Sequence, residues 1–449
     1  MRRTLLSSAL FRGLICIPAA YAEHQHHGET EHPIEEGIRF DAQFFVDAVA
    51  YDRSRDLSTQ EALGIYNVHG GHDSESGEHN HGGGLDNGLN LNNAEAAFKV
   101  VAPGWVDGRL NLAMTSEGLE LEEGWLRTQF LPAGFQLKGG KMLSDIGASN
   151  NLHPHAWDFV DQSLPYQMLF GGSLSGTGVQ AQWQSTSTLA LRLGVEALTA
   201  DNEGVAAFVG SNTASSKGDP IHFAEKSAWP NVWTAFAKIS TEIAPHHALH
   251  AGASWVDSDL HQELHTYHPG INDAEHGLQG KVSMFGIDAG YRFEGHDEHG
   301  AGDITLLAEY WTQNKDLNLT YHELKPQLIG QPRELEVDAL SLQALYGIFP
   351  RWTVGLRYDQ AGMTHEASRS AATVGPKNSS YFDPLDRVSG VLTWNINAQH
   401  QLRLQVSNIS GTFAETPTVG GKDIATKQNF NEVFLQYQFN MGTKNQHSH

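Results

Sequence analysis

Two histidines and two aspartates stand close together in a long irregular stretch between Gly147 and Gly172. They are His153, His155, Asp158 and Asp161, in the run HPHAWDFVDQSLPYQ. Imidazole and carboxylate groups are the ligands that borderline divalent cations such as Zn²⁺ prefer. The proline between the two histidines favours an extended backbone, so both rings point to one side and still need a third ligand. Two interpretations stay open: a metal site, or a loop whose polar groups hydrogen-bond to neighbouring structure.

Two further stretches are rich in histidine and acid. The glycine-rich run HGGHDSESGEHNHGGG contributes His69, His72, His79 and His81, and a later run contributes His261, His265 and His268. The first run is too flexible to be a preformed site, but it could wrap a cation weakly; the alternative is a solvated loop. His261 and His265 stand at i, i+4, a spacing that suits a metal only if the stretch is helical.

No catalytic motif accompanies these residues. The chain has no G-x-S-x-G, no H-E-x-x-H and no glycine-rich phosphate loop in a suitable context. We therefore expect no enzyme and no required cofactor, with Zn²⁺ or another divalent cation as a ligand or substrate.

The N-terminus and the composition restrict the location. Arg2 and Arg3 precede an apolar run that closes with Ala20-Tyr21-Ala22, which predicts a signal peptide over 1–22. The remaining chain then lacks cysteine, since Cys16 is the only one, and lacks an apolar run long enough for a membrane helix. A formal net charge of −23 argues against nucleic-acid partners and favours cations.

Apolar and polar residues alternate along much of the chain, as in Leu189 to Glu196 and Trp352 to Asp359. Period two predicts strands with one apolar and one polar face. The candidate strands are sixteen: 36–51, 88–102, 106–116, 119–130, 133–143, 175–186, 188–200, 229–243, 247–258, 278–293, 302–314, 334–348, 352–361, 385–398, 400–412 and 426–441. Short turns such as Ala102-Pro103-Gly104 alternate with long connections, apart from a tight turn near Gly118 and an extended one at 295–302.

This alternation of short and long connections is typical of outer-membrane barrels, and a soluble sandwich has no reason to sort its loops in this way. We predict an all-β fold, a transmembrane antiparallel barrel of about sixteen strands over 36–441. A His-rich periplasmic segment (23–35) would precede it, either a disordered tail or a metal-collecting arm, and a short polar tail (442–449) would follow.

Two adjoining runs carry a resemblance to known proteins. The run from Leu119 to Asn150 is similar to the strand-turn-strand before the third loop of the phosphate-selective porin superfamily of Gram-negative bacteria. The block from Asn151 to Gly172 more closely resembles His-rich, zinc-responsive porin-like outer-membrane proteins, sometimes labelled TonB-dependent receptors. The resemblance implies a third extracellular loop folded inward, with His153, His155, Asp158 and Asp161 near the narrowest point.

Two features depart from that pattern. Only about fifteen residues separate Ala22 from the first expected strand, so we expect no plug domain and no TonB-type active transport. Such barrels commonly end on an aromatic residue that the barrel-assembly machinery recognises, whereas here Phe439 is followed by 440–449. Porins of this kind are often trimers, so a homotrimer embedded in outer-membrane lipid is an expectation from the resemblance.

Strand parity predicts which charged residues face the lumen. The expected pore-lining set is Arg109, Glu120, Glu122, Lys138, Arg192, Glu196, Arg357, Asp359 and Arg403. The chain is thus expected to be a passive channel for small solutes, with divalent metal ions such as zinc collected by its His/Asp/Glu loops. Two alternatives stay open: an anion or phosphate porin, and a non-conducting metal-binding surface protein.

Overall fold

The structure, a computed structural model, describes residues 37–54, 85–115, 118–185, 189–226, 229–265, 275–295, 298–369, 378–381, 384–419 and 422–442. The expected signal peptide, the His-rich segment 23–35, the tail 443–449 and most of the first outer connection lie outside these residues. Five histidines of the expected metal-binding stretches also lie outside the described residues: His69, His72, His79, His81 and His268.

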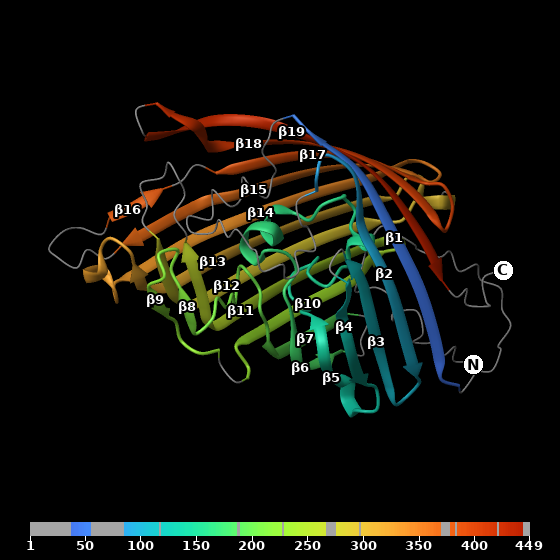
Figure 1. Cartoon of the computed structure of the whole chain (residues 1–449). Helices are drawn as coiled ribbons and strands as arrows, with labels where there is room; N and C mark the ends of the chain where they lie inside the picture. Colours follow the sequence, from blue (N-terminus) through green and yellow to red (C-terminus); the bar gives the residue numbers. More distant parts are fainter. Residues whose placement is uncertain are drawn as a thin grey trace, which may run out of the picture.

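Sixteen antiparallel strands form a closed barrel, as the sequence predicts (Figure 1). They are β1 (Arg39–Arg53), β2 (Gly88–Ala102), β3 (Val106–Thr115), β4 (Gly118–Thr128), β5 (Phe135–Leu143), β6 (Ser175–Gln184), β7 (Ala190–Thr199), β10 (Val232–Ala244), β11 (His247–His265), β12 (His276–Phe293), β13 (Ile304–His322), β14 (Pro332–Phe349), β15 (Trp352–Arg369), β17 (Leu385–Asn395), β18 (His400–Val419) and β19 (Lys422–Gly442). Each strand pairs with its neighbours along the chain, and β1 pairs with β19 to close the sheet. Closure leaves no unpaired edge in the membrane.

A few short elements lie outside this ring. They are β16 (Asn378–Tyr381), which pairs with the outer end of β15, the hairpin of β8 (Asn212–Ala214) and β9 (Pro220–His222), four 3₁₀ turns η1 (Pro132–Gly134), η2 (Pro154–Ala156), η4 (Glu298–Gly300) and η5 (Pro326–Leu328), and the π-helix η3 (Pro165–Phe170). Among the described residues, no helix is long and apolar enough to cross a membrane.

Several strands run further than the sequence pattern predicts. The expected strand 247–258 continues as β11 to His265, and β18 and β19 extend to Val419 and Lys422, which pair with each other, so strand occupies most of the long eighth outer connection expected at 413–425. The register shifts between Ser258 and His261, and the four successive residues from Leu260 to Glu263 are all buried. The fourth outer connection, between β7 and β10, covers this end of the strand, and its Ala207 carbonyl accepts from the Gln262 amide at 2.9 Å. Alternation therefore stops there while the strand continues. The expected ends of these strands were therefore wrong.

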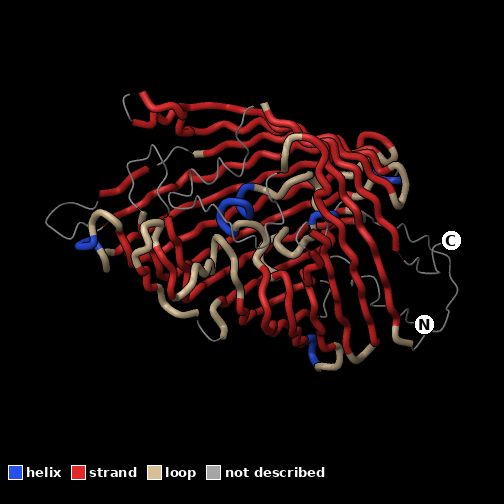
Figure 2. Tube along the Cα trace, in the orientation of Figure 1, coloured by secondary structure: helices blue, strands red, loops and turns tan. Residues whose placement is uncertain are grey.

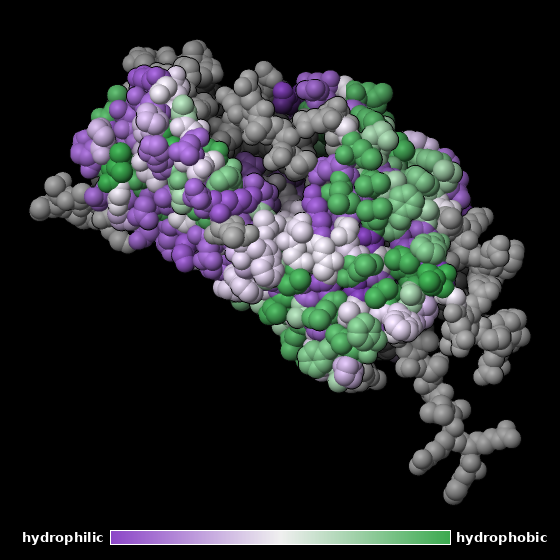
Figure 3. Space-filling view, turned by 60° about the horizontal axis from the view of Figure 1, so that its bottom comes forward, coloured by the Kyte–Doolittle hydropathy of each residue, from purple (hydrophilic) through white to green (hydrophobic). Residues whose placement is uncertain are grey.

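The outside of the barrel carries large apolar side chains at every second position. Leu126, Val195, Phe285 and Leu356 are each about half exposed. Figure 3 shows hydrophobic residues spread over one part of the surface and hydrophilic residues gathered at the end at its left. An apolar surface of this extent on a closed barrel is the surface that faces lipid.

The barrel interior contains a folded segment (Figure 2). The segment 144–174 connects β5 to β6 and lies within the ring of strands, and its η3 buries Tyr166, Leu169 and Phe170. The Phe170 ring packs edge-on against Trp311 of β13, with centroids 4.9 Å apart. This segment is the inward-folded third outer loop that the sequence predicts, and we call it the third loop.

Candidate functional site: the third loop across the barrel

The base of the third loop is closed by one asparagine. Asn150 donates to the carbonyls of Ser144 (2.8 Å) and Leu174 (3.0 Å), and its oxygen accepts from the Leu174 amide at 2.7 Å. Both ends of the loop are thereby held together where it leaves the sheet. The side chain supplies the hydrogen bonds that strand pairing no longer provides.

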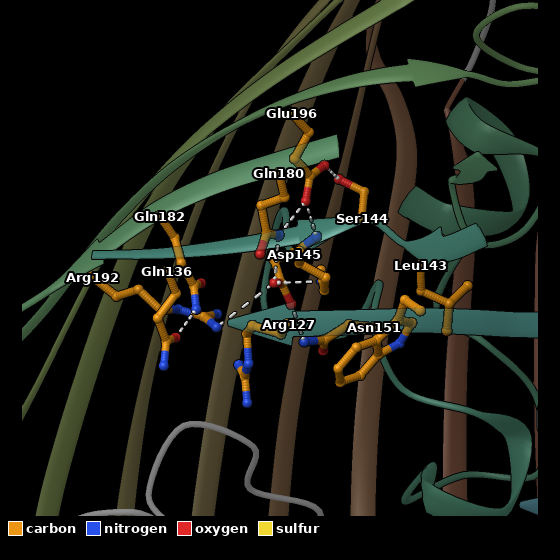
Figure 4. A network of polar contacts seen from close by, with 12 residues as sticks. Arg127, Gln136, Leu143, Ser144, Asp145, Asn151, Gln180, Gln182, Arg192 and Glu196 are labelled. Atoms are coloured by element: carbon orange, nitrogen blue, oxygen red, sulfur yellow. Dashed lines mark hydrogen bonds and ion pairs between the residues drawn. The ribbon is translucent and has the colours of Figure 1, made fainter. Parts of the chain in front are cut away.

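A polar network fixes the first turn of the loop to β6 and β7 (Figure 4). Glu196 accepts from the Ser144 hydroxyl, from the Asp145 amide at 3.0 Å and from Gln180 at 2.7 Å. Asp145 in turn lies 3.2 Å from Lys138 Nζ. Burial alone would raise the pKa of Asp145, but Lys138 and Arg192 outweigh it and hold that pKa well below its usual range.

The first wall contact of the loop lies on β2, β3 and β4. His153 Nδ1 lies 3.0 Å from Glu95 Oε1 and 3.3 Å from Glu122 Oε2, and its Nε2 lies 2.8 Å from Glu123 Oε2. His155 Nδ1 lies 2.5 Å from Glu95 Oε2, and its ring stacks on Phe45 with centroids 3.7 Å apart. We call His153, His155 and the three glutamates the acidic-histidine anchor.

The two histidines of this anchor differ in charge. Burial disfavours the charged form of both rings. For His153, hydrogen bonds to Glu122, Glu123 and Glu95 outweigh burial and raise its pKa well above the usual value. For His155 burial dominates over its single carboxylate partner and lowers its pKa.

The second wall contact uses arginines of β15 and β17. Asp161 accepts from Arg357 Nη2 at 2.6 Å and from Arg387 Nη1 at 2.5 Å, and Gln405 donates to it at 2.7 Å. Asp359 holds the Arg387 guanidinium from the other side at 2.7 Å. Burial would raise the pKa of Asp161, but the two arginines lower it to about 2. We call this group the arginine anchor.

A third wall contact faces β10, β11 and β13. The Tyr166 hydroxyl donates to Glu309 Oε1 at 2.5 Å, and Lys238 Nζ donates to the Gly147 carbonyl at 2.6 Å. The Gly147 amide donates to Ser254 at 2.9 Å. The loop is thus held on three sides of the barrel, which fixes its position across the lumen.

A cavity of about 80 Å³ remains between the third loop and the wall formed by β10 to β15. Its acidic and basic lining residues are Asp158, Asp161, Lys238, His250, Asp288 and Arg357. Carboxylates and bases therefore face one another across a narrow polar space. Such a space can admit small hydrated solutes and discriminate among them by charge.

The structure separates the four polar residues of the loop that the sequence groups together. His153 and His155 are in the acidic-histidine anchor, whereas Asp161 is bound by two arginines on another wall and lines the cavity with Asp158. These hydrogen bonds are of the kind expected from the second interpretation, in which the polar groups of the loop bond to neighbouring structure.

The later histidine pair lies on a strand, so the helical arrangement considered for it is wrong. His261 and His265 lie on β11 with Glu263 between them on the same face, at 2.7 and 3.1 Å from its two oxygens. Lys315 also contacts Glu263, at 2.7 Å. Period two rather than period 3.6 brings the two rings to one carboxylate.

The residues expected to line the pore are either buried or paired with an oppositely charged side chain. Seven of them are buried: Lys138, Arg192, Glu196, Arg357, Asp359, Arg403 and Glu122. Arg109 contacts Glu123 at 3.3 Å and Glu120 contacts Lys141 at 3.7 Å. Arg403 donates to the Trp157 carbonyl at 2.9 Å, so it also holds the third loop.

Sequence parity missed Glu95 and Glu123 because bulges precede them. The β1–β2 register shifts between Leu91 and Asn93, and the β3–β4 register shifts so that Asn111 faces Glu123 while Leu112 faces Leu121. A bulge adds one residue and re-aims the side chains that follow it. Glu122 and Glu123, although adjacent, therefore both reach His153. Arg387 needed no bulge, since the apolar Val388 and Leu392 already place it on the inner face.

These features define the class of the protein. A closed sixteen-strand antiparallel barrel with an apolar outer surface and a polar, loop-constricted interior is an integral β-barrel of the bacterial outer membrane.

Comparison with known proteins gives the following relatives. No known family profile matches the sequence. An uncharacterized protein of Aquifex aeolicus strain VF5 is 24% identical over 398 residues, which cover 88% of this chain and 76% of the relative. Among solved structures, OmpT, an outer membrane protein of Vibrio cholerae, aligns at a TM-score of 0.49 and 11% identity over 90% of this chain and 97% of its own.

Two further solved structures align over similar lengths. The outer membrane channel DcaP of Acinetobacter baumannii aligns at a TM-score of 0.47 and 14% identity, over 92% of this chain and all of its own. The anion-selective porin from Comamonas acidovorans aligns at a TM-score of 0.46 and 9% identity, over 90% of this chain and 99% of its own. The pairing of the strands in this chain establishes the barrel independently of these alignments.

Proposed function

We propose that the protein is a passive channel for small solutes and for divalent cations such as Zn²⁺. The observation that carries the proposal is the third loop, held on three sides of the lumen and bordering a cavity lined by Asp158 and Asp288. The formal net charge of −23 supports attraction of cations to the barrel mouth. The passage needs no energy source.

The histidine-rich first outer connection supports the zinc assignment. His69, His72, His79 and His81 stand among acidic residues in a glycine-rich sequence, which favours weak capture. Weak capture allows release into a pore, whereas tight capture would retain the ion.

An anion channel is the second candidate, and the inward-facing bases favour it. Lys138, Arg357 and Arg387, however, lie 3.2, 2.6 and 2.7 Å from Asp145, Asp161 and Asp359 respectively. Because carboxylates neutralise these bases, their attraction for anions is weakened. We therefore favour cations.

The sign of the reversal potential tests the choice. Purified, refolded protein is inserted into planar bilayers with a KCl gradient, and we expect stepwise openings whose reversal potential favours K⁺. A reversal potential that favours Cl⁻ supports the anion channel, and tight zinc binding without openings supports a non-conducting surface protein.

A further inference from the structure

Three ligand atoms meet at the acidic-histidine anchor with the spacing of a metal site. Glu95 Oε1, Glu122 Oε2 and His153 Nδ1 all lie within 4.8 Å of one another. Two of the separations are 3.0 and 3.3 Å. Zinc bonds of about 2.1 Å in tetrahedral geometry place neighbouring ligand atoms roughly 3.4 Å apart. The three atoms are therefore close to the positions that they would take around such an ion.

Asn111 supplies a fourth vertex. Its amide Nδ2 lies 3.0 Å from Glu95 Oε1, 2.7 Å from Glu122 Oε2 and 3.1 Å from His153 Nδ1. Its Oδ1 is buried and has no hydrogen-bond partner among the described residues. Turning the amide by half a rotation directs that oxygen at the other three ligand atoms, because the amide oxygen and nitrogen have nearly the same shape.

The charges of the anchor also favour a cation. Glu95, Glu122 and Glu123 are all buried, and Arg109, which pairs with Glu123, is 30% exposed. A proton on His153 Nδ1 can be donated to Glu95 or to Glu122 but not to both. Three buried carboxylates gathered around one imidazole repel one another, and a divalent cation would neutralise two of them at once.

We propose that Glu95, Glu122 and His153, with the side-chain oxygen of Asn111, bind a divalent cation of the Zn²⁺ class that fastens the third loop to β2, β3 and β4. The ligands come from the loop and from three different strands, so binding joins the loop to the wall. Metal occupancy then controls how firmly the loop is held across the lumen. Metal binding stands apart from the channel assignment, whereas its effect on current rests on the proposed function.

Zinc binding to the full chain tests the site. We expect the wild-type barrel to bind one more equivalent of Zn²⁺ than Glu95→Gln/Glu122→Gln, measured by equilibrium titration with a chromophoric chelator. The histidine-rich outer connection contributes equally to both proteins, so the difference belongs to the anchor. Equal stoichiometry and affinity in the two proteins overturn the proposal and leave a protonated His153 as the bond between loop and wall.

A control and a second variant keep the comparison interpretable. Asp338→Asn removes a buried carboxylate of β14, and we expect it to bind as many equivalents as wild type. If the double variant does not assemble, His153→Asn replaces it, with at least tenfold weaker binding of the same equivalent expected. Cobalt(II) in place of zinc supplies a spectroscopic readout, because tetrahedral Co²⁺ absorbs strongly in the visible and the variants should lose that band.

Current recordings separate the two proposals. We expect micromolar zinc to reduce open-channel noise in wild type and in Asp338→Asn but not in the variants of the anchor. Loss of the zinc equivalent without any change in zinc-dependent noise overturns the coupling to the loop. A zinc equivalent in a protein without openings overturns the proposed function and leaves the site intact.

Discussion

Asp161 and Arg387, 226 positions apart in sequence, form an ion pair of 2.5 Å that fastens the third loop to the barrel wall. Arg357 binds the same carboxylate at 2.6 Å. Asp161 is thus shared by two guanidinium groups, which the buried Asp359 supports from the wall side. Neither arginine can leave this arrangement without exposing a buried charge.

Substitution of Asp161 tests this anchor. We expect Asp161→Asn to destabilise the folded barrel by roughly 3–5 kcal/mol, because the guanidinium groups of Arg357 and Arg387 then share only the Asp359 carboxylate and one buried positive charge is left uncompensated. The measurement is the midpoint of thermal unfolding in detergent, together with open-channel noise, which should rise. Asp201→Asn, whose carboxylate pairs with Lys226 on the surface, is the control and should change stability by less than about 1 kcal/mol. Equal effects of the two substitutions would contradict the anchor.

The same carboxylate predicts a pH dependence. The arginines lower the pKa of Asp161 to about 2, below its usual value of 3.8. A depressed pKa stabilises the fold above the unfolded-state pKa, and this contribution is lost as pH falls from about 4 through about 2. The wild-type barrel should therefore lose about 2 kcal/mol over that window. Asp161→Asn should show a smaller loss, as measured by denaturant unfolding at each pH. Parallel pH profiles for the two proteins would rule this contribution out.

The sixteen strands and the inward loop could be predicted because lipid imposes a strict apolar alternation on the outer face. No such constraint acts on the extracellular ends of the strands, where β11 buries four successive residues under the fourth outer connection. Those ends were therefore placed too early. The partners of His153 could not be predicted, because one bulge decides the direction of Glu95 and another that of Glu123.

Removal of one hydroxyl tests the third wall contact. We expect Tyr166→Phe to destabilise the barrel by about 1–3 kcal/mol, because the buried Glu309 carboxylate loses a hydrogen-bond donor. Limited proteolysis should also cut the third loop faster. Tyr346→Phe, on the exposed outer face, is the matched control and should leave both measurements unchanged. A proteolysis rate equal to that of wild type would show that Tyr166 does not hold the loop.

A glycine between two strands tests the barrel wall itself. Gly140 has φ +133°, and a Cβ there would lie 2.1 Å from the Gly124 carbonyl oxygen of the paired strand. We expect Gly140→Ala to slow assembly and to lower the thermal midpoint, because β4 and β5 must separate to admit the methyl group. Gly390→Ala on β17, where a Cβ meets nothing within 4 Å, should assemble normally. Assembly is followed by the heat-dependent shift in electrophoretic mobility.

If the first outer connection captures zinc, its histidines should affect zinc entry only at low zinc concentration. Replacement of His69, His72, His79 and His81 by glutamine should reduce zinc entry at low micromolar zinc and leave it unchanged at millimolar zinc. At high concentration the pore itself limits flux, so prior capture no longer matters. A matched replacement of the exposed His222 and His246 serves as control. Equal losses at both concentrations would point to damage to the pore.

Zinc flux tests the central claim most directly. Liposomes that contain the refolded protein and an internal zinc-sensitive dye are mixed with external Zn²⁺, with no energy source. The account predicts that dye fluorescence rises far faster than in empty liposomes and stops when the zinc concentrations are equal on both sides. A rate equal to that of empty liposomes, in vesicles whose protein is folded and inserted, would contradict it.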